Sequence, residues 1–188
     1  MTINSLTAPH SPYDRQRVGN LAAFIVCAGM MTFALIAQYV WLMEPCPLCV
    51  FQRIALIVLG LVFLLAALHA PGRTGQRVYA VLLAGAALAG AAVAGRHVWL
   101  QHLPKDQVPS CGPGLDFMFD TFPVLEVLNM VLSGSGECAE VSWRFLGLTM
   151  PAWTLISFVL LGGWGVWLNG VNRHRRPAVS AGPSDRPS

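Results

Sequence analysis

The sequence predicts an all-α membrane protein, a four-transmembrane-helix bundle with a short helix lying on the membrane surface. Only 11% of the 188 residues are charged and 55% are hydrophobic, whereas a soluble domain carries about 25% charged residues. Four apolar runs are long enough to cross a bilayer core, which takes about 20 residues. A long polar-to-mixed segment, residues 101–149, separates the third run from the fourth.

The first apolar run covers residues 21–43 and follows a polar stretch, residues 1–19. A secretory signal has an apolar core of only about 7–15 residues, so we expect this longer run to be a transmembrane helix. Cys27 lies inside it and is expected to be a small apolar core residue, as buried free cysteines usually are.

A short basic loop joins the second and third runs. The second run covers residues 47–70 and the third covers residues 78–100. The third run is rich in Ala and Gly, and small residues let membrane helices approach closely, so we expect it inside the bundle. Arg96, near its far end, is expected to extend its charge to the lipid headgroups.

The fourth run covers residues 150–168, and a tail with several arginines follows it. We therefore expect an N-terminal tail (1–19), a four-helix transmembrane domain that includes the long loop (20–170), and a C-terminal tail (171–188). The proline and serine content of the C-terminal tail predicts disorder.

The basic residues predict the orientation in the membrane. With four spans, both termini and the 71–77 loop share one side, which holds Arg15, Arg17, Arg73, Arg77, Arg173, Arg175, Arg176 and Arg186. The other side has fewer cations, two in its loop and two at helix ends: Lys105, Arg144, Arg53 and Arg96. The positive-inside rule then places both termini in the cytoplasm, and in a bacterium the long loop would face the periplasm. This pattern accounts for the net charge of +3, so we expect no nucleic-acid partner.

Two closely spaced cysteines lie at the start of the second run, in Glu44-Pro45-Cys46-Pro47-Leu48-Cys49. Proline suits the first position of a helix, so Cys46 is expected near the helix cap and Cys49 in the first turn. Unpaired N–H groups and the helix dipole there favour the thiolate, which is the reactive form. Arg53 shares a helical face with Cys49, where it would stabilise a thiolate or hold an anionic group of a membrane-bound ligand.

Other interpretations of this cysteine pair are weaker. A CxxC can be half of a zinc site, and a c-type haem site would need histidine where Val50 stands. A structural disulfide between residues this close would constrain little chain. The spacing therefore favours a redox-active pair over a metal site.

A second pair, Cys111 and Cys138, is expected on the same outer side, where disulfides persist. Glycine-rich backbone flanks both cysteines, and the mobility it allows suits disulfide exchange. Between them, residues 122–132 are too short to span a membrane and predict a short helix on its surface. This segment could also be a loop plug that covers the bundle, and the two interpretations do not exclude each other. The alternative to a redox-active pair is a zinc site made by all four outer cysteines.

These motifs together resemble the disulfide bond formation protein B (DsbB) family of bacterial inner membranes. The resemblance rests on Glu44 to Cys49 with Gln52-Arg53, on Cys111 with Asp116-Phe117-Met118, on Gly136 to Glu140, and on Trp143, Phe145 to Leu148 and Met150 to Trp153. It covers the chain from the first span through the fourth. Relative to the family pattern, Gly112-Pro113-Gly114 is an addition after Cys111 that loosens this loop.

The resemblance implies an enzyme that reoxidises a soluble periplasmic thiol oxidase (DsbA-like) and passes the electrons to a membrane quinone, ubiquinone or menaquinone. It implies that Cys111 forms the mixed disulfide with the partner, and that Cys138 then attacks Cys46. Cys49 is released as a thiolate beside the quinone, and Arg53 stabilises it. The DsbA–DsbB–quinone chain that keeps the bacterial periplasm oxidising is a known system.

The sequence leaves open the role of two histidines and the choice between an enzyme and a structural protein. His97 and His102 lie near the outer end of the third span and could hydrogen-bond a quinone oxygen, although ordinary interface histidines are commoner. The chain could also be a structural four-span protein with static periplasmic disulfides, or a relative that serves a dedicated partner oxidase.

Overall fold

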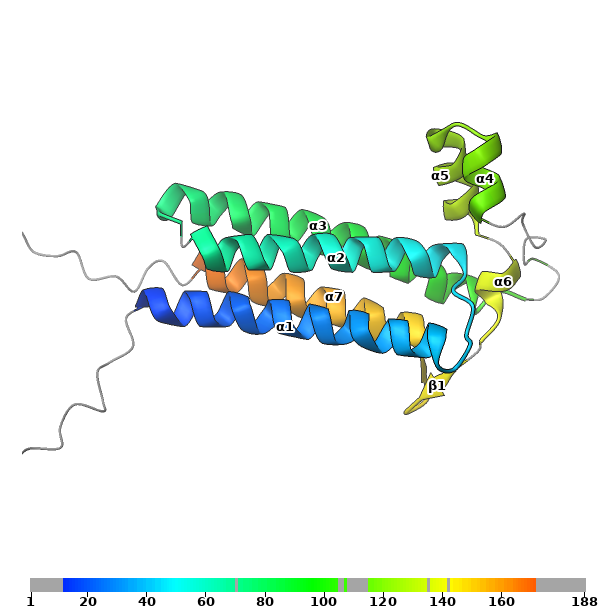
Figure 1. Cartoon of the computed structure of the whole chain (residues 1–188), viewed down its shortest axis with the longest axis horizontal. Helices are drawn as coiled ribbons and strands as arrows, with labels where there is room; N and C mark the ends of the chain where they lie inside the picture. Colours follow the sequence, from blue (N-terminus) through cyan, green and yellow to red (C-terminus); the bar gives the residue numbers. More distant parts are fainter. Residues whose placement is uncertain are drawn as a thin grey trace, which may run out of the picture.

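The computed structural model describes residues 12–69, 71–104, 107, 115–134, 136–141 and 143–171. Four long helices lie side by side, with the smaller elements gathered at one end (Figure 1). The long helices are α1 (Pro12–Tyr39), α2 (Pro47–His69), α3 (Arg73–Leu100) and α7 (Met150–Val166), which continues as a π-helical turn, η1 (Trp167–Val171). All four are long and apolar enough to cross a membrane. The predicted all-α, four-span architecture is confirmed.

The smaller elements come from the long loop. They are α4 (Leu115–Thr121), α5 (Val124–Ser133), α6 (Gly136–Ala139) and the antiparallel pair β1 (Arg144–Phe145) and β2 (Leu148–Thr149). The helix predicted over 122–132 is present as α5, and Figure 1 shows α4 and α5 projecting to one side of the bundle end. The hairpin was not predicted. Its two turn residues, Leu146 and Gly147, both have positive φ, as a tight hairpin turn requires.

The helix boundaries differ from the predicted spans in two places. The first helix runs over Pro12–Tyr39 rather than 21–43, because polar residues before the apolar run continue the helix, and Leu42 takes a positive φ of 54° after its end. The third helix begins at Arg73, directly after Gly72. The second begins at Pro47, as predicted. The two predicted tails, 1–19 and 171–188, lie mostly in residues 1–11 and 172–188, which are outside the described residues.

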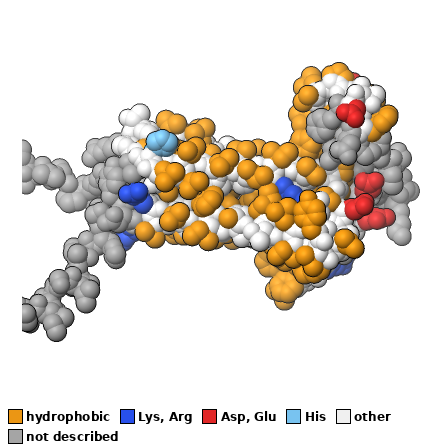
Figure 2. All heavy atoms as spheres, in the orientation of Figure 1, with side chains coloured by type: hydrophobic (Ala, Val, Ile, Leu, Met, Phe, Trp, Pro, Cys, Tyr) orange, Lys and Arg blue, Asp and Glu red, His pale blue; other side chains and the backbone are white. Residues whose placement is uncertain are grey.

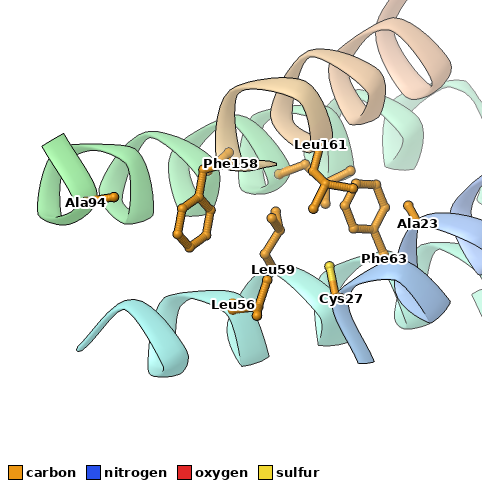
Figure 3. Packing of buried hydrophobic residues seen from close by; sticks show 10 residues of the cluster. Ala23, Cys27, Leu56, Leu59, Phe63, Ala94, Phe158 and Leu161 are labelled. Atoms are coloured by element: carbon orange, nitrogen blue, oxygen red, sulfur yellow. The ribbon is translucent and has the colours of Figure 1, made fainter. Parts of the chain in front are cut away.

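Neighbouring helices pack in a defined order. α1 packs on α2, and α3 packs on both α2 and α7, whereas the interface between α1 and α7 is small. Large apolar side chains from α2 and α7, among them Phe63 and Phe158, fill the space between the helices (Figure 3). Cys27 is buried in the same cluster, which confirms its expected role as a small core residue.

Small residues bring α3 and α7 together, as the composition of the third span predicts. A Cβ added to Gly90 would lie 2.4 Å from ring atoms of Phe158, and one added to Gly162 would lie 2.6 Å from the Cβ of Ala87. Gly85 has no heavy atom within 4 Å of such a Cβ. Only some of the glycines in α3 therefore serve helix packing.

A buried amide pair ties α1 to the end of α7. The Asn169 Nδ2 donates to Asn20 Oδ1 at 3.0 Å, and Asn20 Nδ2 donates to Asn169 Oδ1 at 3.2 Å. The Trp164 indole N–H donates to the carbonyl of Gly19 at 3.3 Å. These bonds close the α1–α7 seam near the chain termini, while the opposite end of the seam holds a cavity.

Candidate functional site

The Cys46–Cys49 pair lies at the amino end of α2. The two Sγ atoms are 3.1 Å apart, and the backbone N–H of Cys49 points to the Sγ of Cys46 at 3.4 Å. The geometry follows from the sequence, because Pro47 starts the helix and leaves Cys46 just before it. The two sulfurs are close enough to form or release a disulfide with little backbone movement.

His97 from α3 lies against both sulfurs. Its side chain is only 3% exposed, with Nε2 3.8 Å from Cys46 Sγ and Nδ1 3.9 Å from Cys49 Sγ. The Gln52 side-chain amide lies 3.0 Å from Nδ1. With Gln52 Nε2 donating, the imidazole proton is on Nε2 and faces Cys46. His102 instead lies exposed and bonds to the carbonyl of Val98, so only one of the two predicted histidines reaches the cysteines.

Arg53 lies one turn below Cys49 and is held by α1. Its guanidinium donates to the side-chain oxygen of Gln38 and, at 3.1 Å, to the carbonyl of Ala34. Arg53 and Cys49 line the same cavity. The structure therefore brings together the cation and the thiol that the helical spacing placed on one face.

The cavity has a volume of about 620 Å³ and lies between α1, α2, α7 and the β1–β2 hairpin. Aromatic side chains form one wall: Trp143 and Phe145 are stacked at 5.7 Å with an angle of 8° between their planes, and Phe33 lies 6.0 Å from Trp143. Trp153 donates its indole N–H to the carbonyl of Phe145 at 3.1 Å. Such a wall suits a flat, apolar ligand.

Acidic side chains gather at one end of the molecule. Figure 2 shows carboxylates at the end that carries the smaller elements, whereas basic side chains occur toward both ends of this face. The carboxylates that line the cavity are Glu44, Glu137 and Glu140. Three carboxylates therefore line the same cavity as Arg53.

Cys138 lies at the same end of the molecule as the Cys46–Cys49 pair. It is buried on α6 in an apolar cluster with Leu48, Leu100 and Val131, and Cys46 packs against this cluster. Cys111, the fourth predicted redox cysteine, lies outside the described residues. The structure thus brings three of the four cysteines to one end of the bundle.

Arg96 connects α3 to the loop helix α5. Its guanidinium donates to the carbonyls of Leu132 and Ser133 at 3.0 and 3.1 Å and lies 4.1 Å from the ring centre of Trp99. A cation at these terminal carbonyls stabilises the end of α5. These contacts fix the loop helix to the end of α3 beside the site, and the expected position of Arg96 at the lipid headgroups stays a prediction.

Sequence reasoning missed the partners of the key side chains. Gln52 is 5% exposed and orients His97, and Gln38 holds Arg53. The available signal was the presence of amide side chains within apolar spans, because polar groups there usually face the bundle interior.

Comparison with known proteins gives a consistent result. The family model "Disulfide bond formation protein DsbB" matches residues 16–168. A disulfide bond formation protein B of Nitrosococcus oceani is 54% identical over 147 residues, which are 78% of this chain and 87% of that protein. The Chromobacterium violaceum protein of the same name is 53% identical over 85% of this chain and 95% of its own length. The Hahella chejuensis protein is 58% identical over 77% of this chain and 86% of its own.

The family-model match extends from the first spanning helix through the last and includes the positions of the Cys46–Cys49 pair. The four spanning helices and the cysteine cluster agree with a membrane protein of disulfide bond formation. The chain therefore belongs to the DsbB family.

Proposed function

We propose that this protein is a thiol-disulfide:quinone oxidoreductase that reoxidises a periplasmic DsbA-like dithiol oxidase. The observation that carries the proposal is the position of the Cys46–Cys49 pair, which lines a largely apolar cavity between spanning helices. A disulfide there can take electrons from a protein on one side and release them to a lipid-soluble acceptor on the other.

The cysteines would act as a relay. The partner's dithiol attacks the Cys111–Cys138 disulfide through Cys111 and leaves as a disulfide, and the loop pair is reduced. Cys138 then attacks Cys46, which breaks the Cys46–Cys49 disulfide and frees the Cys49 thiolate. The loop disulfide re-forms when Cys111 displaces Cys46, so two electrons reach the Cys46–Cys49 pair. Cys138 is buried within the apolar cluster against which Cys46 packs, and this proximity supports the proposed order.

The cavity fits a quinone headgroup as acceptor. A quinone has a flat ring with two polar oxygens, and when bound it supplies a sink for two electrons and two protons. The stacked Trp143 and Phe145 rings offer a flat apolar wall. Arg53 and His97, which also line the cavity, offer N–H donors for oxygen atoms. Ubiquinone and menaquinone share this chemistry, so the proposal covers both.

The energetics require an acceptor that is not a thiol. A DsbA-type partner has a potential of about −120 mV and is itself a strong oxidant. Exchange among thiols and disulfides only redistributes oxidising power between proteins. A membrane quinone would supply the missing sink, and a cavity lined by residues of spanning helices supports this choice.

The proposed location is the bacterial inner membrane, with both termini in the cytoplasm and the redox cysteines in the periplasm. The many arginines near the termini support this orientation, as the positive-inside rule predicts. Exposed apolar residues on α5, Val124 and Leu125, support contact of this helix with the membrane surface.

The proposal is tested by following quinone reduction by absorbance with purified protein, a short-chain quinone and the reduced partner oxidase. We expect turnover in the wild type and none in Cys49→Ser, which keeps the loop cysteines. A preparation that is inactive although the same partner and quinone react with another DsbB would support static disulfides instead.

A further inference from the structure

Three soft or borderline ligand atoms converge beside the cavity. The Sγ atoms of Cys46 and Cys49 and a ring nitrogen of His97 all lie within 4.8 Å of one another. The two sulfurs come from the start of α2 and the imidazole from α3, so two packed helices fix the arrangement. Two thiolates and an imidazole form a ligand set that prefers Zn²⁺ and similar thiophilic cations.

The distances are close to those of a zinc site. Zn–S bonds of about 2.3 Å and Zn–N bonds of about 2.0 Å place tetrahedral ligands about 3.8 Å apart for two sulfurs and about 3.5 Å for sulfur and nitrogen. The observed separations are 3.1 Å for the two sulfurs and 3.8 Å from Cys46 Sγ to His97 Nε2. A side-chain rotation that moves the sulfurs apart by less than 1 Å would bring the sulfur–sulfur distance to the value expected for zinc.

The surroundings also favour a divalent cation. The Gln52 side chain contacts the other imidazole nitrogen through its Nε2. Metal binding at His97 Nε2 therefore requires the Gln52 amide to turn, so that its oxygen accepts from Nδ1 and holds the ring, as partners of metal-bound histidines do. Glu137 and Glu140 line the same cavity and attract cations. The positive charge of Arg53 opposes cation binding. Its guanidinium, however, is held by hydrogen bonds to the Gln38 side chain and the Ala34 carbonyl.

We propose that the reduced Cys46–Cys49 pair and His97 form a three-ligand site for a thiophilic divalent cation, with the fourth position open to water or a carboxylate. Binding releases the two thiol protons and involves no electron transfer. The disulfide form lacks the two thiolates and cannot bind. The inference rests on the proposed function in one respect: a cation that traps the dithiol blocks its reoxidation by quinone, so such metals inhibit the enzyme.

The test uses full-length Cys111→Ser/Cys138→Ser protein in detergent, which removes the loop thiols, and Co²⁺ alone as the probe. We expect the dithiol form to bind one equivalent, with sulfur-to-cobalt charge-transfer absorption and the visible bands of a tetrahedral site, and Zn²⁺ to displace it. The disulfide form of the same protein should show none of these bands. His97→Ala should weaken Co²⁺ binding at least about tenfold, and Cys27→Ser, in the distant helix core, should leave it unchanged.

The proposal would be overturned if the dithiol and disulfide forms gave equal Co²⁺ spectra. It would also be overturned if adding His97→Ala to the double variant left the Co²⁺ spectrum unchanged. The redox comparison needs no mutation at the site, so it decides the matter even if His97→Ala does not fold. Quinone reduction by the same double variant with dithiothreitol, measured without metal, tests the proposed function separately. Turnover without Co²⁺ binding would refute only the metal site, and Co²⁺ binding without turnover would refute only the quinone reaction.

Discussion

Arg53 is the residue whose role depends most on its surroundings. It lies one helical turn from Cys49, and both line the cavity. Its bonds to Gln38 and to the Ala34 carbonyl hold the guanidinium in place. A fixed cation beside a thiol stabilises charge that develops there and loses little energy to reorganisation.

The first prediction follows from this position. Arg53→Leu should slow quinone reduction at least about tenfold, as loss of an oriented donor usually does, while thiol exchange between the partner and the loop cysteines stays nearly unchanged. Arg53→Lys keeps the charge but loses the two-pronged contact, so it should recover part of the rate. Both steps are measured by stopped-flow, the first by quinone absorbance and the second by partner fluorescence. An equal loss in both steps would contradict this division of roles.

Part of the site could be predicted at the residue level. The position of the cysteine pair at the start of α2 follows from Pro47, and the shared face of Cys49 and Arg53 follows from helical spacing. The contact of Gln52 with His97 joins residues 45 positions apart, so it depends on how α2 packs on α3. Neither residue's local sequence contains that information.

Among the elements, α3 is the helix that the packing depends on, because it contacts both α2 and α7. Gly90 faces the ring of Phe158 on α7, whereas Gly85 faces open space. The sequence shows that α3 is rich in small residues, but glycines five positions apart lie on different faces of a helix, and only the packed structure distinguishes them.

The second prediction uses these two glycines as a matched pair. Gly90→Val should destabilise the bundle by about 1–3 kcal/mol, because the added methyl groups overlap the Phe158 ring. Gly85→Val makes the same chemical change without a neighbour and should have little effect. Thermal unfolding in detergent, followed by tryptophan fluorescence, measures both. Similar melting temperatures for the two variants would show that the α3–α7 interface adjusts without cost.

The β1–β2 hairpin is the element that sequence reasoning did not find. Its strands have only two residues each, too few to show an alternating pattern. Leu146 takes a positive φ in the turn, where glycine or asparagine is usual. The hairpin nevertheless matters, because Phe145 forms part of the aromatic wall of the cavity.

At the scale of the whole molecule, the bundle has a closed end and an open end. The Asn20–Asn169 pair joins α1 to the end of α7, and the cavity with the cysteine pair lies at the opposite end of the same seam. Apolar patterning predicted the four spans correctly, and arginine placement predicts an orientation. Patterning could not predict the cavity, which is lined by residues of α1 and α7, two helices that contact each other little.

The third prediction concerns orientation. Alkaline phosphatase is active only after export, so a fusion after residue 188 should be inactive and an insertion at Gln107 in the long loop should be active. The end of the bundle at which α1 begins and η1 ends would then be cytoplasmic. Activity of the C-terminal fusion and inactivity of the loop insertion would reverse the orientation and place the cysteine pair in the reducing compartment.

The most direct measurement is a single-turnover titration of the Cys46–Cys49 pair with quinone. Cys111→Ser/Cys138→Ser protein, fully reduced and freed of reductant, is mixed with increasing quinone, and thiols are counted after an acid quench. We predict that each quinone reduced consumes two thiols, that Cys46 and Cys49 are recovered as a disulfide, and that Cys27 remains a thiol. If both site thiols survive an excess of quinone, the pair does not deliver electrons to the membrane pool, and the central claim is wrong.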